Sequence, residues 1–255
     1  MTARLELFAV PGLPLVRADD DLPALIVAGL DRAGQRLLDR DVVVIAQKIV
    51  SKAEGRAVDL ATVTPSDAAV ALAGEVGKDA RIVDVVLSES VKVVRRRPNL
   101  MIMQHRLGFV MANAGVDQSN VAEADGDQRA LLLPLDPDRS AEAIRARLAD
   151  HYEADFGVVI SDSFGRPWRR GTVGVAIGAA GLPSLIDLRG QPDLFGRTLE
   201  VSIIGFADEI AAAASLLQGQ AAEAQPVVVV RGLEWRAPTM PVADMVRPPE
   251  EDLFQ

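Results

Sequence analysis

A run of four consecutive β-branched residues inside the apolar segment 41–46 most constrains the fold of this chain. Short apolar runs without alternation are typical of strands that are buried on both faces of a sheet. Because segments of strand and helix character do not alternate regularly, the sequence predicts an α+β fold with mixed sheets and packed helices. Further strands are predicted at 157–160, 184–188, 201–206 and 226–230, a β-hairpin at 100–104 and 108–112, and helices at 66–77, 79–89, 140–152 and 208–217.

Proline-rich sequence near the C-terminal end predicts a separate tail. Four prolines within residues 237–255 favour an extended segment that either wraps the surface or is disordered. Polar or proline-bearing breaks at 125–127 and 134–137 are points where a subdomain could be inserted. We therefore expect a main domain over residues 1–236, with its division into subdomains left open, followed by the tail.

Composition excludes several classes of protein. A chain of 255 residues, 49% of them hydrophobic, buries a core large enough to fold without disulfides or a structural metal. The absence of cysteine excludes disulfides, thiolate zinc sites, iron–sulfur clusters and cysteine nucleophiles. A net charge of −9, spread along the chain, argues against a nucleic-acid partner. With neither a signal-peptide pattern nor a membrane-spanning apolar run, we expect a cytoplasmic protein without a membrane partner.

A loop rich in oxygen-bearing side chains is predicted at residues 113–120. It follows a predicted strand and holds amide, carboxylate and hydroxyl groups around a glycine. Such oxygen ligands suit Mg²⁺ or Mn²⁺, which take one or two carboxylates and leave other positions to substrate phosphates. A turn capped by its own Asx side chains is the alternative that the spacing leaves open.

A second candidate segment, residues 161–170, follows the predicted strand 157–160. Asp162 stands at the strand end, where metal ligands often lie, and Arg166, Arg169 and Arg170 could clamp anionic oxygens bidentately. A solvated basic loop is the alternative, although a glycine and a tryptophan among the arginines suit it poorly.

Two lysines come directly after the strand predicted at 41–46. Lys48 and Lys52 are four residues apart, so they share a helical face and could contact phosphate as point charges. The signatures GxxxxGK[ST] and GxGxxG do not occur in the sequence, so a nucleotide site would be of an unusual kind. His105 and His151 lack a second histidine at ligand spacing, and we expect both to be structural.

Taken together, these stretches resemble the coenzyme F-420-0:L-glutamate ligase family (F-420-0:γ-glutamyl ligase), which attaches glutamate to a deazaflavin coenzyme. The resemblance covers nearly the whole chain, and two of its segments are long and unusual in composition. The matching sequences are VPGLPLV at 10–16, DVVVIAQKIVSKAEGR at 41–56, GFVMANAGVDQSN at 108–120, SDSFGRPWRRG at 161–171, LIDLRGQPDLFGR at 185–197, ADE at 207–209 and PVVVVRG at 226–232.

The resemblance implies a GTP-dependent ligase with two divalent cations, Mg²⁺ or Mn²⁺, and potassium as a further monovalent cation. It also implies a fold peculiar to the family and an intertwined homodimer. Phosphoryl transfer from GTP to the carboxylate of F-420-0 would give an acyl phosphate, and L-glutamate would displace phosphate to form the amide, with GDP as the other product. Some members carry an additional flavin-binding reductase domain, and we expect this chain to represent the single-domain form.

Residues of the matching motifs acquire roles by the same resemblance. Asp117 and Asp162 would hold the first metal, while Ser163 and Gln220 would help to hold the second. Asp117, Asp162, Arg166 and Arg169 are the catalytic candidates, with the arginines holding anionic groups of the acceptor or the transferring phosphoryl group. The nucleotide would contact Leu13, Pro14, Leu15, Val16, Gln47, Lys48, Lys52, Asn120, Gln218, Gly219 and Gln225.

Two other functions stay open at this stage. An amide ligase of the same mechanism could act on another carboxylate acceptor. A regulatory module could bind the nucleotide without turnover, but the presence of both metal carboxylates, Asp117 and Asp162, argues against it.

Overall fold

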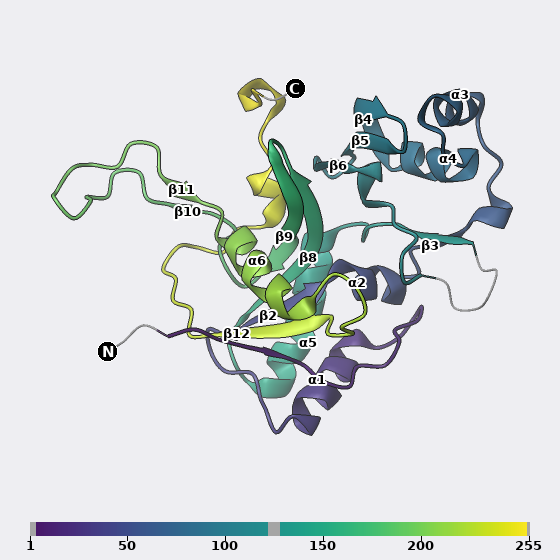
Figure 1. Cartoon of the computed structure of the whole chain (residues 1–255). Helices are drawn as coiled ribbons and strands as arrows, with labels where there is room; N and C mark the ends of the chain where they lie inside the picture. The colour runs from purple at the N-terminus through teal and green to yellow at the C-terminus, as the bar shows by residue number, and fades with distance from the viewer. Residues whose placement is uncertain (1–3, 122–127, 254–255) are drawn as a thin grey trace.

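The computed structural model describes residues 4–121 and 128–253, so the predicted break at 125–127 lies outside the described part. Helices and strands are interspersed, and the expected mixture of α and β structure is confirmed (Figure 1). The helices are α1 Leu22–Arg32, α2 Gln47–Ala53, α3 Asp67–Val76, α4 Ala80–Ser88, α5 Pro137–Tyr152 and α6 Phe206–Gln218, with short turns η1 Leu60–Thr62, η2 Asn113–Gly115, η3 Val242–Met245 and η4 Pro249–Glu251. The strands are β1 Glu6–Ala9, β2 Val42–Ala46, β3 Ala57–Asp59, β4 Ser90–Arg97, β5 Leu100–His105, β6 Val110–Ala112, β7 Arg129–Leu131, β8 Gly157–Arg166, β9 Arg169–Ala180, β10 Ile186–Asp187, β11 Ile203–Ile204 and β12 Val227–Arg231.

The main sheet has the strand order β1-β12-β2-β8-β9, in which β2 and β8 are parallel and the other pairs antiparallel. The β-branched run of β2 is buried on both faces, as its sequence predicts. Val43 and Ile45 belong to a core shared with α1 and α5, whereas Val42 and Val44 belong to a core shared with α6. Helices therefore cover both faces of the sheet.

A smaller lobe is inserted between α2 and α5 (Figure 1). It contains α3, α4 and the sheet β4-β5-β6, which enclose a hydrophobic core of their own. The predicted helices and the β5–β6 hairpin of this lobe are confirmed. Strand β4 was not predicted, because its sequence is dominated by exposed valine, lysine and arginine without a buried face.

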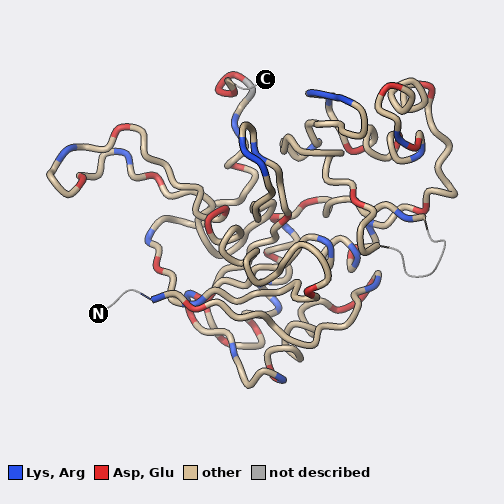
Figure 2. Tube along the Cα trace, viewed as in Figure 1, with Lys and Arg blue, Asp and Glu red and all other residues tan. Residues whose placement is uncertain are grey.

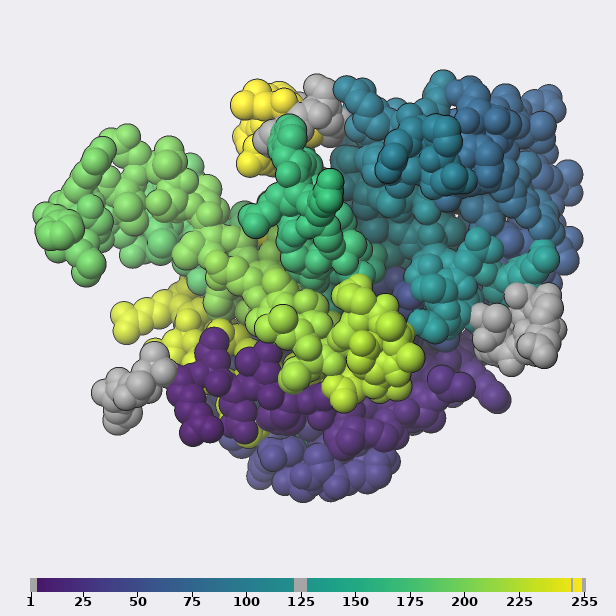
Figure 3. Space-filling model, in the orientation of Figure 1, coloured from purple at the N-terminus to yellow at the C-terminus, as the bar shows by residue number. Residues whose placement is uncertain are grey.

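A two-stranded arm formed by β10 and β11 projects from the body of the molecule (Figures 1 and 3). The strands predicted at 184–188 and 201–206 are wrong in extent, because each pairs over only two residues. The chain between them is held by its own turns, including a hydrogen bond from Leu199 N to Gln191 O of 2.9 Å. Because β10 and β11 pair only with each other, the apolar residues next to them have no further strand to pair with and do not lengthen either one.

The tail wraps the surface over its described residues, 237–253. Val242 is buried, and Ser184 Oγ donates a hydrogen bond of 2.7 Å to Pro241 O. Asp138 Oδ1 accepts a hydrogen bond of 2.8 Å from Val242 N, which fixes the tail to the start of α5. None of the helices within 4–121 and 128–253 is long and apolar enough to cross a lipid bilayer.

Two further predictions are corrected at element boundaries. Helix α5 begins three residues before the predicted position, because Asp136 caps it and Pro137 fits its first turn. The strand predicted at 157–160 is too short: β8 continues to Arg166, and a two-residue turn connects it to β9. The second half of β8 was not predicted as a strand, because it contains glycine and polar residues and only the first half is apolar.

Candidate functional site

A cavity of about 320 Å³ lies at the carboxyl end of β2. Its walls come from the segment after β1, the start of α2, strands β8 and β9, and the chain that follows α6. All predicted nucleotide contacts line it, namely Leu13, Pro14, Leu15, Val16, Gln47, Lys48, Lys52, Asn120, Gln218, Gly219 and Gln225. Of the predicted metal ligands, Asp162, Ser163 and Gln220 line it as well.

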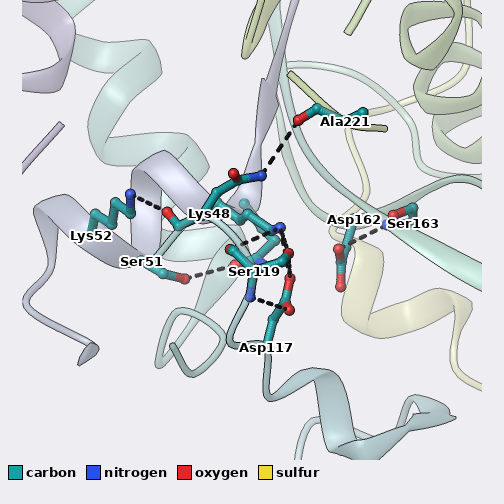
Figure 4. A network of polar contacts seen from close by, with 10 residues as sticks. Lys48, Ser51, Lys52, Asp117, Ser119, Asp162, Ser163 and Ala221 are labelled. Carbon is teal, nitrogen blue, oxygen red and sulfur yellow. Dashed lines mark hydrogen bonds and ion pairs between the residues drawn. The ribbon is translucent and has the colours of Figure 1, made fainter. Parts of the chain in front are cut away.

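Helix α2 places both lysines next to the loop that contains Asp117 (Figure 4). Lys48 Nζ lies 2.6 Å from Asp117 Oδ2 and donates a hydrogen bond of 2.7 Å to Ser119 Oγ. Lys52 Nζ donates a hydrogen bond of 2.7 Å to the carbonyl oxygen of Asn120. The helical spacing of the lysines therefore orders one wall of the cavity.

A left-handed turn delivers Asp117 to this position. Asn113, Ala114 and Gly115 have φ values of 51°, 52° and 71°, a conformation that is costly for residues with a Cβ. A Cβ added at Gly115 would lie 2.9 Å from the side chain of Leu133, so this position requires glycine. After the turn, Asp117 and Leu131 exchange backbone hydrogen bonds of 3.1 and 2.8 Å.

Asp162 is the first residue of β8 beyond the end of β2, whose last residue, Ala46, pairs with Ser161. From this point β8 pairs only with β9, so its other edge opens into the cavity. Asp162 Oδ1 accepts a hydrogen bond of 2.8 Å from Ser163 N. Figure 4 shows Asp162 and Asp117 approaching the same region from separate strands and loops.

The two carboxylates have opposite electrostatic environments. The pKa of Asp162 is raised to about 6, mainly by burial and also by the negative charge of Asp117. The Ser163 N–H and Lys48 act in the opposite direction and lower it. Burial alone would raise the pKa of Asp117 too, but hydrogen bonds from Lys48 and Ser119 outweigh it and lower that pKa. For Asp162, unlike Asp117, the effect of burial therefore outweighs the positive charge of Lys48.

The donor set fits a divalent cation of the Mg²⁺ type. Asp162, Ser163 and Gln220 line the cavity. Asp117 does not line it, but its carboxylate is close enough to Asp162 to raise the pKa of that residue. Within the described residues, no group of three or more His, Asp or Glu side chains is placed to hold a metal. A hard cation here would therefore complete its coordination with water or with oxygens of a bound phosphate, which is how Mg²⁺ is commonly held in nucleotide sites.

The chain after α6 closes the cavity from the side opposite α2. Asn120 Nδ2 donates a hydrogen bond of 3.4 Å to Ala221 O, and Ser161 Oγ donates one of 3.4 Å to Gln218 Oε1. Sequence reasoning assigned no role to Ser119 or Ser161. The signal for Ser119 was its position two residues after Asp117, where the carboxylate caps the turn by accepting hydrogen bonds of 2.8 Å from both the N–H and the hydroxyl of Ser119.

The arginines lie farther from the cavity than the lysines do. Arg166 pairs with Arg169 at the tip of the β8–β9 hairpin, where Figure 2 shows basic residues close together. Neither residue lines the cavity. Arg166 lies four residues beyond Asp162, about 13 Å along an extended strand. Arg166 Nη2 donates a hydrogen bond of 3.4 Å to Arg170 O. The backbone positions of these arginines are therefore separated from Asp162 along the hairpin.

Neither histidine lines the cavity. His105 is fully buried, and its Nδ1 accepts a hydrogen bond of 2.9 Å from Leu107 N in the β5–β6 turn. His151 stacks edge-on against Tyr152 at the end of α5.

Comparison with known proteins identifies the family of this chain. The model of the family described as F420-0:Gamma-glutamyl ligase matches residues 12–232. A protein of Methanothermobacter thermautotrophicus named Coenzyme F420:L-glutamate ligase is 45% identical over 98% of this chain and 99% of its own length. Proteins with the same name from Methanopyrus kandleri and Archaeoglobus fulgidus are each 43% identical, over 100% and 99% of this chain and 98% and 97% of theirs. The chain therefore belongs to the F420-0:gamma-glutamyl ligase family.

Proposed function

We propose that this protein is a GTP-dependent ligase that joins L-glutamate to coenzyme F420-0 through an acyl phosphate and releases GDP and phosphate. The observation that carries the proposal is the single cavity in which the nucleotide contacts implied by the family resemblance meet Asp162. Relatives named Coenzyme F420:L-glutamate ligase, which cover the chain almost end to end, support the choice of substrates.

The nucleotide would lie between α2 and the chain after α6. Leu13 to Val16 and Ile49 offer apolar surface for the base, and Lys48 and Lys52 offer positive charge for the phosphates. The cavity of about 320 Å³ falls at the lower end of the range for small-molecule sites, which is roughly 300–1,000 Å³.

Asp117 and Asp162 would hold one divalent cation, and Ser163 and Gln220 would contribute to a second. When bound, such cations neutralise the charge of the phosphates and of the acceptor carboxylate. The chain's own residues orient this arrangement: Lys48 holds Asp117, and the N–H of Ser163 holds Asp162. Potassium belongs to the same proposal as an additional cation, which replacing potassium by sodium in the assay would test.

An acyl phosphate mechanism requires no protein nucleophile. The γ-phosphoryl group passes from GTP to the acceptor carboxylate, and the glutamate amine then attacks the activated carbonyl carbon while phosphate leaves. The chain has no cysteine, and neither histidine reaches the cavity. Arg166 and Arg169, at the hairpin tip, would hold anionic groups of the acceptor away from the reacting carboxylate.

We also propose that two copies of the chain associate through the arm. Leu194 and Phe195 at its end are 99% and 95% exposed, an unusual state for large apolar side chains. A second copy would remove them from water. The intertwined homodimer implied by the family resemblance gives the same expectation.

One assay separates the proposed activity from its alternatives. Protein is incubated with GTP, Mn²⁺, L-glutamate and F420-0, and the deazaflavin is analysed by mass spectrometry. Addition of one or more glutamate residues, with matching GDP release, supports the proposal. GDP release only with a different carboxylate favours the alternative acceptor, and no turnover with any acceptor favours a regulatory module.

Asp162→Asn is the matched control for this assay. It removes one negative charge without creating a cavity, so the fold should persist while turnover is lost. Full activity of this variant at ordinary metal concentrations would contradict the assignment of Asp162.

A further inference from the structure

The β8–β9 hairpin contains a bulge immediately before Asp162. Ile160 pairs with Gly178, but the next residue of β8, Ser161, pairs with Ala176, so Ile177 is an additional residue in β9. From there the pairing is regular as far as Gly165, with Asp162 opposite Val175 and Ser163 opposite Gly174. Bulges shift the side chains that follow them and are frequent beside active sites.

The bulge decides which face of the hairpin each side chain occupies. Gly174 faces α6 so closely that a Cβ there would lie 2.3 Å from Ala211 O. If the bulge were absent and Ile177 paired with Ser161, the register beyond it would slip by one, and Val175 would take the place of Gly174 against this backbone. The partner of Asp162 would change at the same time. The position of the carboxylate thus depends on the bulge.

Two aspartates hold the bulge from the free edge of β9, the last strand of the main sheet. Asp208 Oδ1 accepts a hydrogen bond of 2.9 Å from Ala176 N, on one side of the bulge. Asp138 Oδ1 accepts a hydrogen bond of 2.8 Å from Ala179 N, on the other side. Both belong to the first turns of helices, α6 and α5, that pack against β9 (Figure 1).

The two aspartates differ in what else they do. Asp138 also accepts hydrogen bonds from Val242 N and Ala243 N, so it anchors the tail. For Asp208, the bond from Ala176 N is the one hydrogen bond found, and no ion pair to it is seen within 4–121 and 128–253. Burial raises the pKa of Asp208, so its placement costs free energy. A carboxylate that only stabilised the first turn of α6 could lie in solvent, so the partial burial of Asp208 points to its bond with β9.

We propose that Asp208 is a positioning residue of the active site, whose acceptor oxygen fixes the β9 bulge and thereby the register of Asp162 and Ser163. The proposal rests on the proposed function in so far as Asp162 and Ser163 are metal ligands. Asp208 acts through the backbone of β9 and does not touch the substrates. Its acceptor oxygen, rather than its charge, carries the effect.

The test compares the full-length, metal-free protein with Asp208→Ala, Asp208→Asn and Asp136→Ala. Asparagine keeps an Oδ1 acceptor at the same place, whereas alanine removes it. Asp136→Ala is the matched control, because Asp136 accepts a backbone hydrogen bond of 3.0 Å from Arg139 N at the start of α5 rather than from β9. Hydrogen exchange is followed in peptides that cover β8, β9 and α6, and Mn²⁺ affinity is measured by calorimetry.

We expect Asp208→Ala to exchange about tenfold faster in β8 and β9 beyond the bulge, with little change in the rest of α6. Its Mn²⁺ affinity should fall by about ten- to a hundredfold, the usual effect of losing a group that orients a metal ligand. Asp208→Asn and Asp136→Ala should match the wild-type protein in both measurements.

Faster exchange confined to the first turn of α6 would overturn the proposal, because Asp208 would then be a helix cap. Equal loss of Mn²⁺ affinity in Asp208→Asn and Asp208→Ala would overturn it too, because the charge would be responsible. The asparagine variant decides the question even where the alanine variant does not fold. Failure of the wild-type protein to bind Mn²⁺ would contradict the proposed metal site, whereas the exchange result tests the role of Asp208 independently.

Discussion

The ammonium group of Lys48 lies 2.6 Å from the Oδ2 atom of Asp117, although Lys48 precedes the smaller lobe in the sequence and Asp117 follows the sheet β4-β5-β6 of that lobe. One lysine therefore lines the cavity and also holds one of the two carboxylates assigned to the metal. Because both side chains are about one-third exposed, this ion pair adds little to the free energy of folding. Its value lies in placing a positive charge and a metal ligand at a fixed separation.

Lys48→Met should raise the KM for GTP by about tenfold, since it removes a charge-assisted contact to phosphate worth roughly 1.5 kcal/mol. The KM for glutamate should change little. Steady-state kinetics with each substrate varied in turn checks this. Lys92→Met, on the exposed strand β4, is the control and should leave both constants as they are. A rise in the KM for glutamate alone would assign Lys48 to the other substrate.

Gly115→Ala should destabilise the protein and weaken Mn²⁺ binding. Gly115 has a φ of 71°, and its new Cβ would lie 2.9 Å from Leu133, so Asp117 would shift with the turn. Gly77→Ala is the matched control: Gly77 has a φ of 68°, but the nearest atom to a Cβ there is 4.0 Å away. The control should lose only about 1 kcal/mol and keep its Mn²⁺ affinity. Equal Mn²⁺ affinity in both variants would show that the turn does not position Asp117.

Glu89 links the smaller lobe to the main body and predicts a dependence of stability on pH. It accepts hydrogen bonds or ion pairs of 3.0 Å from Arg56 and from Arg106, with His105 Nε2 at 3.5 Å. Burial alone would raise the pKa of Glu89, but His105, Arg106 and Arg56 outweigh it and lower that pKa. The ionised carboxylate therefore stabilises the fold above its unfolded pKa, and this contribution is lost as pH falls through the folded pKa.

Glu89→Gln should thus cost about 2–3 kcal/mol near pH 7, somewhat less than a fully buried pair because Arg106 is 40% exposed. Urea denaturation of both proteins between pH 7 and pH 3 gives the difference in unfolding free energy. We expect this difference to shrink below about pH 4, where the carboxylate of the wild-type protein becomes protonated. A difference that stays constant over this range would exclude a charged Glu89 as its cause.

Much of the core of the fold could be predicted from local sequence. The run in β2 is buried on both faces by its own composition, and Ser66 and Gly77 bound α3 as cap residues. The bulge in β9 could not be predicted, because it depends on Ala211 and Asp208 from a helix about 30 residues away. Strand β4 was missed because pairing with β5, rather than a buried face of its own, makes it a strand.

In the candidate site too, some features could be predicted from local sequence and others could not. The sequence alone indicated that Lys48 and Lys52 share a helical face, and the structure places them together on one wall. The left-handed turn before Asp117 was not foreseen, since Ala114 is a residue that local preference keeps out of that conformation. The separation between Arg166 and Asp162 could not be predicted, because it depends on residues 161–166 forming an extended strand.

Phe195→Asp should convert the proposed dimer to a monomer, because the arm's apolar end would then carry a charge at the interface. Light scattering coupled to gel filtration gives the mass in solution. Leu253→Asp is the control, as Leu253 is 86% exposed in the tail and outside the arm. If Phe195→Asp kept the mass of the wild-type dimer, the interface would lie elsewhere. A wild-type protein that is itself monomeric would exclude the dimer altogether.

Transfer of oxygen from the acceptor to phosphate tests the mechanism directly. The amide keeps only one of the two carboxylate oxygens, so if an acyl phosphate forms, the other must leave with the phosphate. F420-0 labelled with ¹⁸O in its reacting carboxylate should yield labelled inorganic phosphate in proportion to the glutamate incorporated. The expectation follows from the cavity, which brings Asp162 and Lys48 together without a cysteine or histidine that could carry a covalent intermediate. Mass spectrometry of the phosphate measures the label, and omission of glutamate controls for hydrolysis. Unlabelled phosphate released alongside full amide formation would mean that GTP hydrolysis does not activate the carboxylate, and the acyl phosphate would have to be abandoned.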